Sequence, residues 1–310
     1  MPAAAVALYV VFMVLPAMFF VLYCSGHRVS KSFDQDPGSM DGTPYEPWRD
    51  TILEKTAQLG RVPCQSVRIS AADGTPLYAR WYPREGRTAV LLHGYRSTPF
   101  NNFFAIAEAF LEAGWSVLMP DMRGNGQSGG RSTLGLKEAD DAVVWADWAA
   151  ARPDCTDVVM YGMSMGGAAI TFAAGREWPD KVRVLVVDAG YHDAKQQIYG
   201  LKQLRFVPKG IFLPLTDLFF RWLLHVRVDT SGLDALKQAA RPMCFITGAE
   251  DTTVAPHIVE ASYRACGGEK IFFKVADAPH TMAFLVGGRE LKTSLFDFIQ
   301  KYIDQREEEK

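Results

Sequence analysis

The stretch that decides the fold is Val158-Val159-Met160-Tyr161-Gly162-Met163-Ser164-Met165-Gly166-Gly167. Its first four residues are typical of a strand buried on both faces, and the Ala- and Ile-rich run that follows is typical of a helix. Between them stands Gly-x-Ser-x-Gly, a pattern that places its serine on a tight strand-to-helix turn. Side chains in place of the two glycines would collide with neighbouring backbone. The N-terminus of the next helix would favour negative charge beside the serine. We therefore predict that Ser164 is a nucleophile.

A serine hydroxyl needs a base, and the base needs an orienting carboxylate. Without them, the same turn would carry an idle serine. Two later strands run into polar loops that supply both groups, Phe245–Asp251 and Val275–His280. Of the six histidines, only His280 lies in a loop after a strand and downstream of the acid. Asp251 is the predicted acid because of its loop position. Two other carboxyl groups remain open as alternatives, Glu250 and Asp277.

Attack on a carbonyl builds negative charge on its oxygen, and preplaced backbone N–H groups stabilise that charge. One donor is expected from Met165, the residue after the nucleophile. The second is expected from the loop after the Thr88–Leu92 strand, His93-Gly94-Tyr95-Arg96-Ser97. We predict that the Tyr95 N–H is this donor. His93 is predicted to brace the loop rather than act as a base.

The pattern along the chain is an antiparallel hairpin around Asp73-Gly74 followed by repeated strand–helix units. Strands are predicted at 65–70, 77–82, 88–92, 115–119, 157–161, 182–187, 243–247 and 270–275, and helices at 51–59, 103–113, 136–151, 165–176, 256–265 and 290–303. This order predicts an α/β domain with a mostly parallel central sheet and helices on both faces.

Five features together resemble the α/β-hydrolase superfamily over about residues 65–305. They are His93-Gly94, the run Asp121-Met122-Arg123-Gly124-Asn125-Gly126-Gln127-Ser128, the serine turn, Gly248–Asp251 with Val254, and His280. The nearest likeness is to small bacterial hydrolases with a short lid, similar to cinnamoyl esterases and monoacylglycerol lipases. The resemblance implies the α/β-hydrolase fold and supports Asp251 as the acid. It does not specify the substrate, because this fold carries many activities. Relatives commonly have Val-Pro soon after the acid, whereas Ala255 separates these two residues here.

An insertion at about 191–227 occupies the place where a short helical cap covers the active site in the resembling proteins. It contains the apolar runs Ile211–Leu215 and Leu218–Leu224. These side chains could simply pack the cap onto the body, or some could line an acyl pocket. We predict an apolar acyl group, with an aromatic group and a short lipid chain equally open.

Residues 1–26 contain no charged side chain, and Ala3–Tyr23 is apolar and long enough to cross a bilayer as a helix. The segment lacks the basic start and small-residue cleavage site of a signal peptide, and Tyr23 fits a lipoprotein signal poorly. An uncleaved single-pass membrane anchor is therefore predicted. The positive charges that follow it would place the enzyme in the cytoplasm. Residues 27–48 are predicted as a linker and 49–306 as the hydrolase domain.

The bulk composition is that of a globular enzyme, with 48% hydrophobic and 22% charged residues among 310. A net charge of −2 gives no reason to expect nucleic-acid binding. The five scattered cysteines form no metal-binding or disulfide pattern, and no cofactor is predicted. We predict a serine hydrolase that cleaves a small-molecule carboxylic ester through an acyl-enzyme on Ser164. A thioesterase or peptidase with the same triad, and more remotely a non-catalytic interaction module, are the alternatives.

Overall fold

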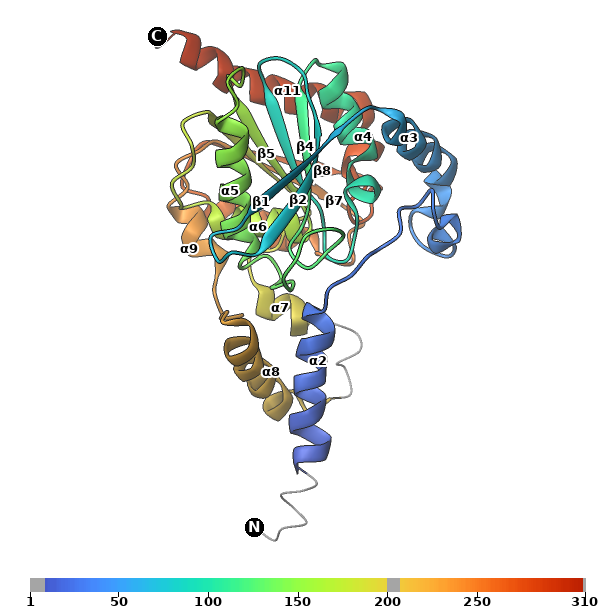
Figure 1. Ribbon diagram of the computed structural model, residues 1–310, viewed down its shortest axis with the longest axis vertical. Coiled ribbons are helices and arrows are strands. Elements are labelled where there is room, and N and C mark those ends of the chain that lie inside the picture. Colours follow the sequence, from blue (N-terminus) through green and yellow to red (C-terminus); the bar gives the residue numbers. More distant parts are fainter. Residues whose placement is uncertain (1–8, 200–206, 309–310) are drawn as a thin grey trace.

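The computed structural model describes residues 9–199 and 207–308. Within them, eight strands form one sheet in the order β1-β2-β4-β3-β5-β6-β7-β8 (Figure 1). The strands are β1 (Gln65–Ser70), β2 (Pro76–Tyr82), β3 (Thr88–Leu92), β4 (Ser116–Asp121), β5 (Val158–Met163), β6 (Val182–Asp188), β7 (Met243–Gly248) and β8 (Lys270–Val275). The first hairpin and the β2–β4 pair are antiparallel, and all other pairs are parallel. The predicted mostly parallel sheet is confirmed.

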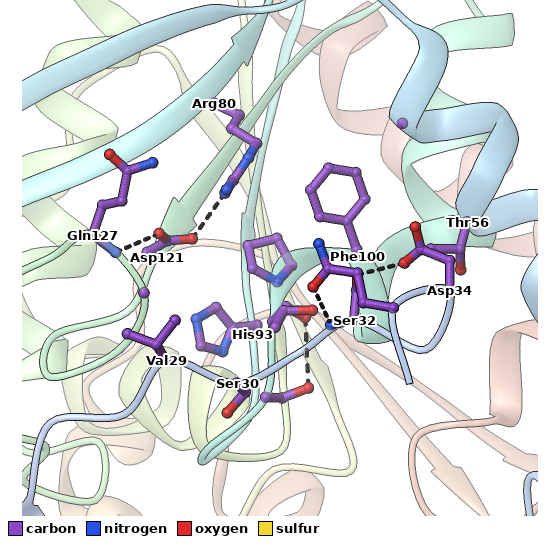
Figure 2. A pocket seen from close by; sticks show the side chains of 16 residues that line it. Val29, Ser30, Ser32, Asp34, Thr56, Arg80, His93, Phe100, Asp121 and Gln127 are labelled. Atoms are coloured by element: carbon purple, nitrogen blue, oxygen red, sulfur yellow. Dashed lines mark hydrogen bonds and ion pairs between the residues drawn. The ribbon is translucent and has the colours of Figure 1, made fainter. Parts of the chain in front are cut away.

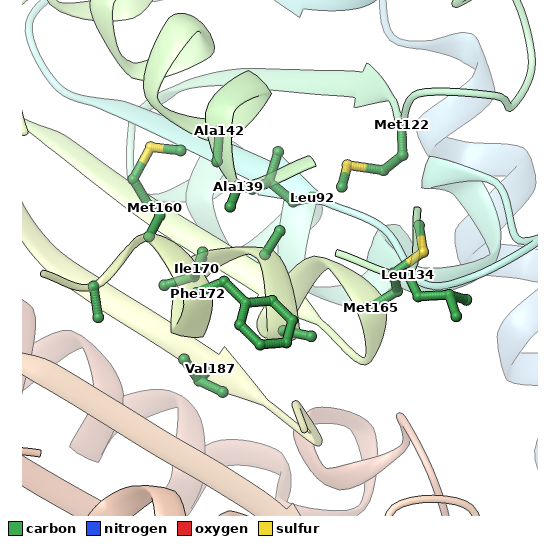
Figure 3. Close-up of a cluster of buried hydrophobic side chains, with 14 of the residues drawn as sticks. Leu92, Met122, Leu134, Ala139, Ala142, Met160, Met165, Ile170, Phe172 and Val187 are labelled. Carbon is green, nitrogen blue, oxygen red and sulfur yellow. The ribbon is translucent and has the colours of Figure 1, made fainter. Parts of the chain in front are cut away.

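Helices cover both faces of this sheet. One face packs against α4 (Pro99–Glu112) and α11 (Ala283–Glu308), and the other against α5 (Glu138–Ala150), α6 (Met165–Ala173) and α10 (Pro256–Ala265). Successive residues of the central strands alternate between two hydrophobic clusters, as the two-residue period of a strand requires. Figure 3 shows part of the first cluster, where Leu92, Met160 and Val187 of three strands lie against α5 and α6. Burial on both faces explains why these strands are continuous apolar runs.

The ends of some helices differ from the pattern-based prediction. The last helix was expected at 290–303, but α11 begins at Ala283 and contains a kink at Gly288, whose φ is 51°. Glycine adopts this left-handed conformation without steric cost, so the chain turns there and then continues as a helix. The helix expected at 51–59 is longer at both ends and forms α3 (Arg49–Arg61), whereas α9 (Gly232–Lys237) was not assigned boundaries from the sequence.

The predicted membrane-spanning helix is wrong, and the single-pass localisation and cytoplasmic orientation that depended on it are wrong as well. In the part of the chain that the structure describes, no helix is long and apolar enough to cross a membrane. The π-helical turn η1 (Val10–Val14) and α2 (Leu15–Ser25) together have 16 residues, about 24 Å of helix, which is short of a bilayer core of about 30 Å. Residues 1–8 of the predicted segment lie outside the described residues.

One face of α2 packs against the protein. α2 lies beside α8 (Lys209–Leu224), away from the sheet (Figure 1). Val21 of α2 is fully buried, and the Phe20 ring meets the Phe212 ring of α8 edge-on, with 5.7 Å between centroids. One face of this apolar segment therefore packs against another helix, while Leu15, Phe19 and Tyr23 on α2 are exposed.

The insertion predicted as a cap contains α7 (Ala194–Tyr199) and α8, and its residues 200–206 lie outside the described residues. Several apolar side chains of α8 belong to the same hydrophobic cluster as α2, including Phe212, Phe219 and Phe220. The stretch 27–48, predicted as a linker, contains the short 3₁₀ helices η2 (Pro37–Met40) and η3 (Glu46–Trp48). Met40 of this stretch is fully buried.

Candidate active site

The turn between β5 and α6 holds Ser164 in a strained conformation, with φ 54° and ψ −113°. Its glycines are needed because backbone passes very close to them. A Cβ on Gly166 would lie 1.8 Å from the Leu92 carbonyl oxygen, and one on Gly162 would lie 2.3 Å from the Gly166 carbonyl oxygen. The Ser164 N–H donates to the Asp188 carbonyl at 2.8 Å. The close backbone contacts and this hydrogen bond therefore fix the backbone position of Ser164.

Ser164, His280 and Asp251 form one hydrogen-bonded chain across three loops. His280 Nε2 lies 3.0 Å from Ser164 Oγ, and His280 Nδ1 lies 2.7 Å from Asp251 Oδ2. An ionised carboxylate only accepts hydrogen bonds, so Nδ1 carries the imidazole proton and Nε2 is free to accept from the serine hydroxyl. The geometry is that of a nucleophile, a base and an orienting acid.

The Asp251 side chain is itself held in place. Its Oδ1 accepts the N–H groups of Thr253 at 2.8 Å and Val254 at 2.9 Å, and the residue is buried. Gly248 at the end of β7 lets the histidine loop approach, since a Cβ there would lie 2.1 Å from the Ala278 carbonyl oxygen. The two alternative acids, Glu250 and Asp277, are both exposed. Within the described residues, Asp251 is the carboxyl group bonded to the His280 ring.

The loop after β3 lies against the nucleophile. A Cβ on Gly94 would be 3.3 Å from the Ser164 Cβ, so the backbone of this loop runs close to the serine. The Gly94 N–H donates to Asn102 Oδ1 at 2.7 Å. Within the described residues, neither the Tyr95 N–H nor the Met165 N–H has a protein acceptor. Both predicted donors therefore have unpaired N–H groups, Met165 directly after the serine and Tyr95 next to Gly94 in the loop that runs beside it.

His93 lies beneath this loop and is fully buried. Its Nε2 accepts the Met122 N–H at 2.9 Å, and its Nδ1 lies 2.7 Å from the Gly94 carbonyl oxygen. Burial lowers the pKa of His93, so the ring is neutral and its Nδ1–H donates to Gly94. These two bonds tie the loop after β3 to the loop after β4, which is the bracing role that the sequence suggested.

The chain has the α/β-hydrolase fold. A family model described as the alpha/beta hydrolase fold matches residues 90–224, a range that contains the serine turn. Among solved structures, the esterase Pf2001 of Pyrococcus furiosus matches with a TM-score of 0.64 and 23% identity, covering 79% of this chain and 95% of the esterase. The ferulic acid complex of Est1E from Butyrivibrio proteoclasticus matches with a TM-score of 0.61 and 20% identity, covering 77% of this chain and 99% of Est1E.

Two curated proteins are similar in sequence. An uncharacterized protein of Bacillus subtilis (strain 168), YqkD, is 24% identical over 224 residues, which are 71% of this chain and 73% of YqkD. A thermostable monoacylglycerol lipase of Bacillus sp. (strain H-257) is 27% identical over 191 residues, which are 59% of this chain and 72% of the lipase.

Asp188, at the end of β6, is a site residue that the sequence reasoning missed. It is fully buried, its Oδ2 accepts the Tyr161 hydroxyl at 2.7 Å, and its Oδ1 has no hydrogen-bond partner. Burial raises the pKa of Asp188 to about 7, against the opposing effects of the Tyr161 hydrogen bond and the nearby His280. The available signal was its place at the end of a buried strand, where the α/β-hydrolase fold gathers its polar groups.

A cavity of about 510 Å³ lies beside the loop after β3, with His93 and Ser97 of that loop in its lining (Figure 2). The ion pair of Arg80 and Asp121, 2.9 Å apart, forms one part of its lining, and Ser30 and His93 form another. None of the triad residues lines it. Within residues 9–199 and 207–308, no group of three or more His, Cys, Asp or Glu side chains is arranged to hold a metal ion.

Proposed function

We propose that this chain is a serine esterase that hydrolyses a carboxylic ester of a small molecule through an acyl-enzyme on Ser164. The observation that carries the proposal is the hydrogen-bonded chain from Ser164 through His280 to Asp251, with distances of 3.0 and 2.7 Å. These contacts support the proposal, because acyl transfer needs a base beside the serine hydroxyl and a carboxylate that orients the base.

In acylation, His280 Nε2 takes the proton of the Ser164 hydroxyl while Oγ attacks the ester carbonyl. The tetrahedral oxyanion is stabilised by the N–H groups of Tyr95 and Met165, and His280 then protonates the departing alcohol. Water then attacks the acyl carbonyl while His280 takes its proton. The bond between the carbonyl carbon and Ser164 Oγ breaks, His280 returns the proton to Oγ, and the acid leaves. The buried Asp251 keeps the imidazole in the correct tautomer and stabilises its positive charge in both halves of the reaction.

The choice of an ester is supported by the relatives, since the similar proteins include a monoacylglycerol lipase and an esterase by name. A thioesterase or peptidase would use the same three residues. An apolar acyl group remains our proposal for the substrate. It is testable with p-nitrophenyl esters of graded chain length beside aryl esters, thioesters and aminoacyl amides.

Labelling with a fluorophosphonate probe tests the nucleophile. The wild-type chain should be labelled and should hydrolyse at least one ester of the series, while Ser164→Ala should do neither. Equal labelling of the two proteins would refute Ser164 as the nucleophile. An active chain that prefers thioesters or amides would refute the ester assignment and leave the triad standing.

The acid and the base are tested with neighbouring controls. Asp251→Asn should lower kcat by about 10⁴-fold, the effect of the same change in the serine protease triad, because the amide favours the wrong histidine tautomer. Glu250→Gln, next in sequence and exposed, should stay within about twofold of wild type. His280→Ala should lose activity as fully, whereas the exposed His257→Ala should keep it. A larger loss from Glu250→Gln than from Asp251→Asn would reverse the assignment of the acid.

A further inference from the structure

The loop His93–Ser97, which carries the proposed oxyanion donor Tyr95, is held partly by its own bonds and partly by contacts from outside it. Arg96, next to the proposed donor Tyr95, has a φ of 52°, a left-handed conformation that costs a non-glycine residue on the order of 1 kcal/mol or more. Within the body of the protein, this loop is held at its start through His93 and Gly94, and the Ser97 N–H donates to the Gly94 carbonyl at 3.3 Å. Such a conformation persists only where surrounding groups hold it.

Those surrounding groups come from the last turn of α2 and the residues just after it. The Tyr95 hydroxyl donates to the Cys24 carbonyl at 2.6 Å, and Arg96 Nη2 donates to the Tyr23 carbonyl at 2.5 Å. The Ser30 hydroxyl donates to the Arg96 carbonyl at 2.8 Å. The side chains of Tyr95 and Arg96, and the Arg96 carbonyl, are thus all bound by residues 23–30.

The chemistry of these contacts suits their position. Carbonyl groups in the last turn of a helix lack intrahelical partners and carry the negative end of the helix dipole, so a guanidinium is a favourable donor to them. The Arg96 guanidinium also lies over the Tyr23 ring, 4.2 Å from its centroid, and 5.0 Å from the centroid of the Tyr95 ring. Arg96 is therefore held between the two aromatic side chains as well as by its hydrogen bond.

The segment that binds the loop is itself anchored to the body. The Arg28 N–H donates to the Gly124 carbonyl at 2.9 Å, and the Arg28 carbonyl accepts the Gly126 N–H at 2.8 Å. The Ser25 carbonyl accepts the Ser132 N–H at 3.1 Å. Figure 2 shows Val29 and Ser30 crossing beside His93, between the loops after β3 and β4. At its other end, α2 packs on α8.

We propose that the last turn of α2 positions the Tyr95 N–H for oxyanion stabilisation, with the Tyr95 hydroxyl and the Arg96 guanidinium as positioning groups. This inference rests on the proposed esterase function. It gives the N-terminal segment, which lies outside the family match at 90–224, a part in the chemistry of Ser164. Because α2 also packs on α8, the position of the cap and the geometry of the oxyanion hole are linked through the same helix.

The test uses Tyr95→Phe and Arg96→Gln in the full chain. Loss of an oxyanion donor costs about 10²–10³-fold in kcat, and displacement of a donor that is still present should cost on the order of tenfold. We expect kcat to fall by about tenfold in each variant with KM within twofold of wild type. The affinity for a trifluoromethyl ketone, which forms a tetrahedral adduct on the serine, should fall by the same factor. Arg96→Lys, which keeps a cation for the Tyr23 carbonyl, should recover part of the loss.

The matched controls are Tyr78→Phe, whose hydroxyl bonds Ser66 on β1, and Arg68→Gln, an exposed arginine of that strand. Both should leave kcat and inhibitor affinity unchanged. Unaltered kcat in Tyr95→Phe and Arg96→Gln would overturn the proposal, as would a loss that appears equally in KM or follows a lowered melting temperature. If wild type neither hydrolyses esters nor reacts with fluorophosphonate, the proposed function fails. If wild type is active and these two variants match it, only the positioning role fails.

Discussion

The Ser164 turn and the N-terminal segment from Tyr9 to Ser30 differ in what holds them in place. At the turn, a Cβ on Gly162 would overlap the backbone of Gly166, and a Cβ on Gly166 would overlap the backbone of Leu92 in β3. The N-terminal segment is held by contacts of its side chains and of the carbonyl groups at the end of α2. These contacts reach residues about 65 to 190 positions later in the sequence, such as Arg96 and Phe212. Steric clashes at the turn exclude every residue except glycine, whereas the packing of the N-terminal segment depends on particular residues elsewhere in the chain.

This difference determines how each region should respond to substitution. A glycine at the turn has no tolerated replacement, because the atoms it would meet belong to the backbone and cannot move aside cheaply. A side chain of α2 should matter only if it faces the protein. Substitutions at Gly166 and on the two faces of α2 separate these two kinds of constraint.

The largest effect is expected from Gly166→Ala. The new Cβ would lie 1.8 Å from the Leu92 carbonyl oxygen, so either β3 or the start of α6 must shift. We expect the free energy of unfolding to fall by about 4 kcal/mol, and esterase activity to fall at least 100-fold because Oγ moves away from His280. Urea unfolding and ester hydrolysis measure the two effects.

Gly60→Ala is the matched control. Gly60 lies in α3, and a Cβ there would meet nothing within 4 Å. Alanine is the better helix former by about 1 kcal/mol, so this variant should be as stable as wild type or more so. A folded and fully active Gly166→Ala protein would contradict the steric account of the turn.

A smaller, pH-dependent effect is expected from Asp188→Asn, directly beneath the turn. The pKa of Asp188 is raised from 3.8 to about 7 by burial. Between these values the carboxyl is ionised in the unfolded chain and protonated in the folded one, so stability is lost as pH rises towards 7. Asparagine has no such ionisation. The stability of the variant relative to wild type should therefore rise by about 2 kcal/mol from pH 5 to pH 7 and level off above it.

Urea unfolding at several pH values checks this expectation. A control is Asp73→Asn, a half-exposed carboxyl whose hydrogen bond from Arg123 lowers its pKa. Its relative stability should not rise between pH 5 and pH 7, because Asp73 is ionised in both states throughout that range. A flat profile for Asp188→Asn would show that Asp188 is ionised in the fold at pH 5.

The central strands and the three triad side chains could be predicted from sequence because their signals are local. Thr88–Leu92 was predicted with the boundaries that β3 has, since a buried parallel strand must be an apolar run with abrupt ends. The end of each parallel strand lies at one edge of the sheet, so the loops carrying Ser164, Asp251 and His280 had to converge there. The structure places these side chains within hydrogen-bonding distance, and their catalytic roles stay predictions.

The N-terminal segment could not be placed in this way because hydrophobic burial is non-directional. Apolar side chains of α2 are equally consistent with lipid and with protein, and nothing local to the segment identifies α8 as the partner. Asp188 was missed for a related reason. A single acid after a buried strand is unremarkable in sequence. Its raised pKa arises from burial, which depends on the tertiary structure, while Tyr161 and His280 lower the pKa.

The smallest effect concerns which face of α2 is bound to the protein. Val21 is fully buried, whereas Phe19, two residues earlier on the same helix, is 69% exposed. Val21→Ala should lower the free energy of unfolding by about 1.5 kcal/mol, because it removes two buried methyl groups from the hydrophobic cluster that α2 shares with α8. Phe19→Ala deletes a much larger side chain but should change stability by less than about 0.5 kcal/mol. Urea unfolding of the two variants decides the matter, since a larger loss from Phe19→Ala would mean that the opposite face of α2 packs on the protein.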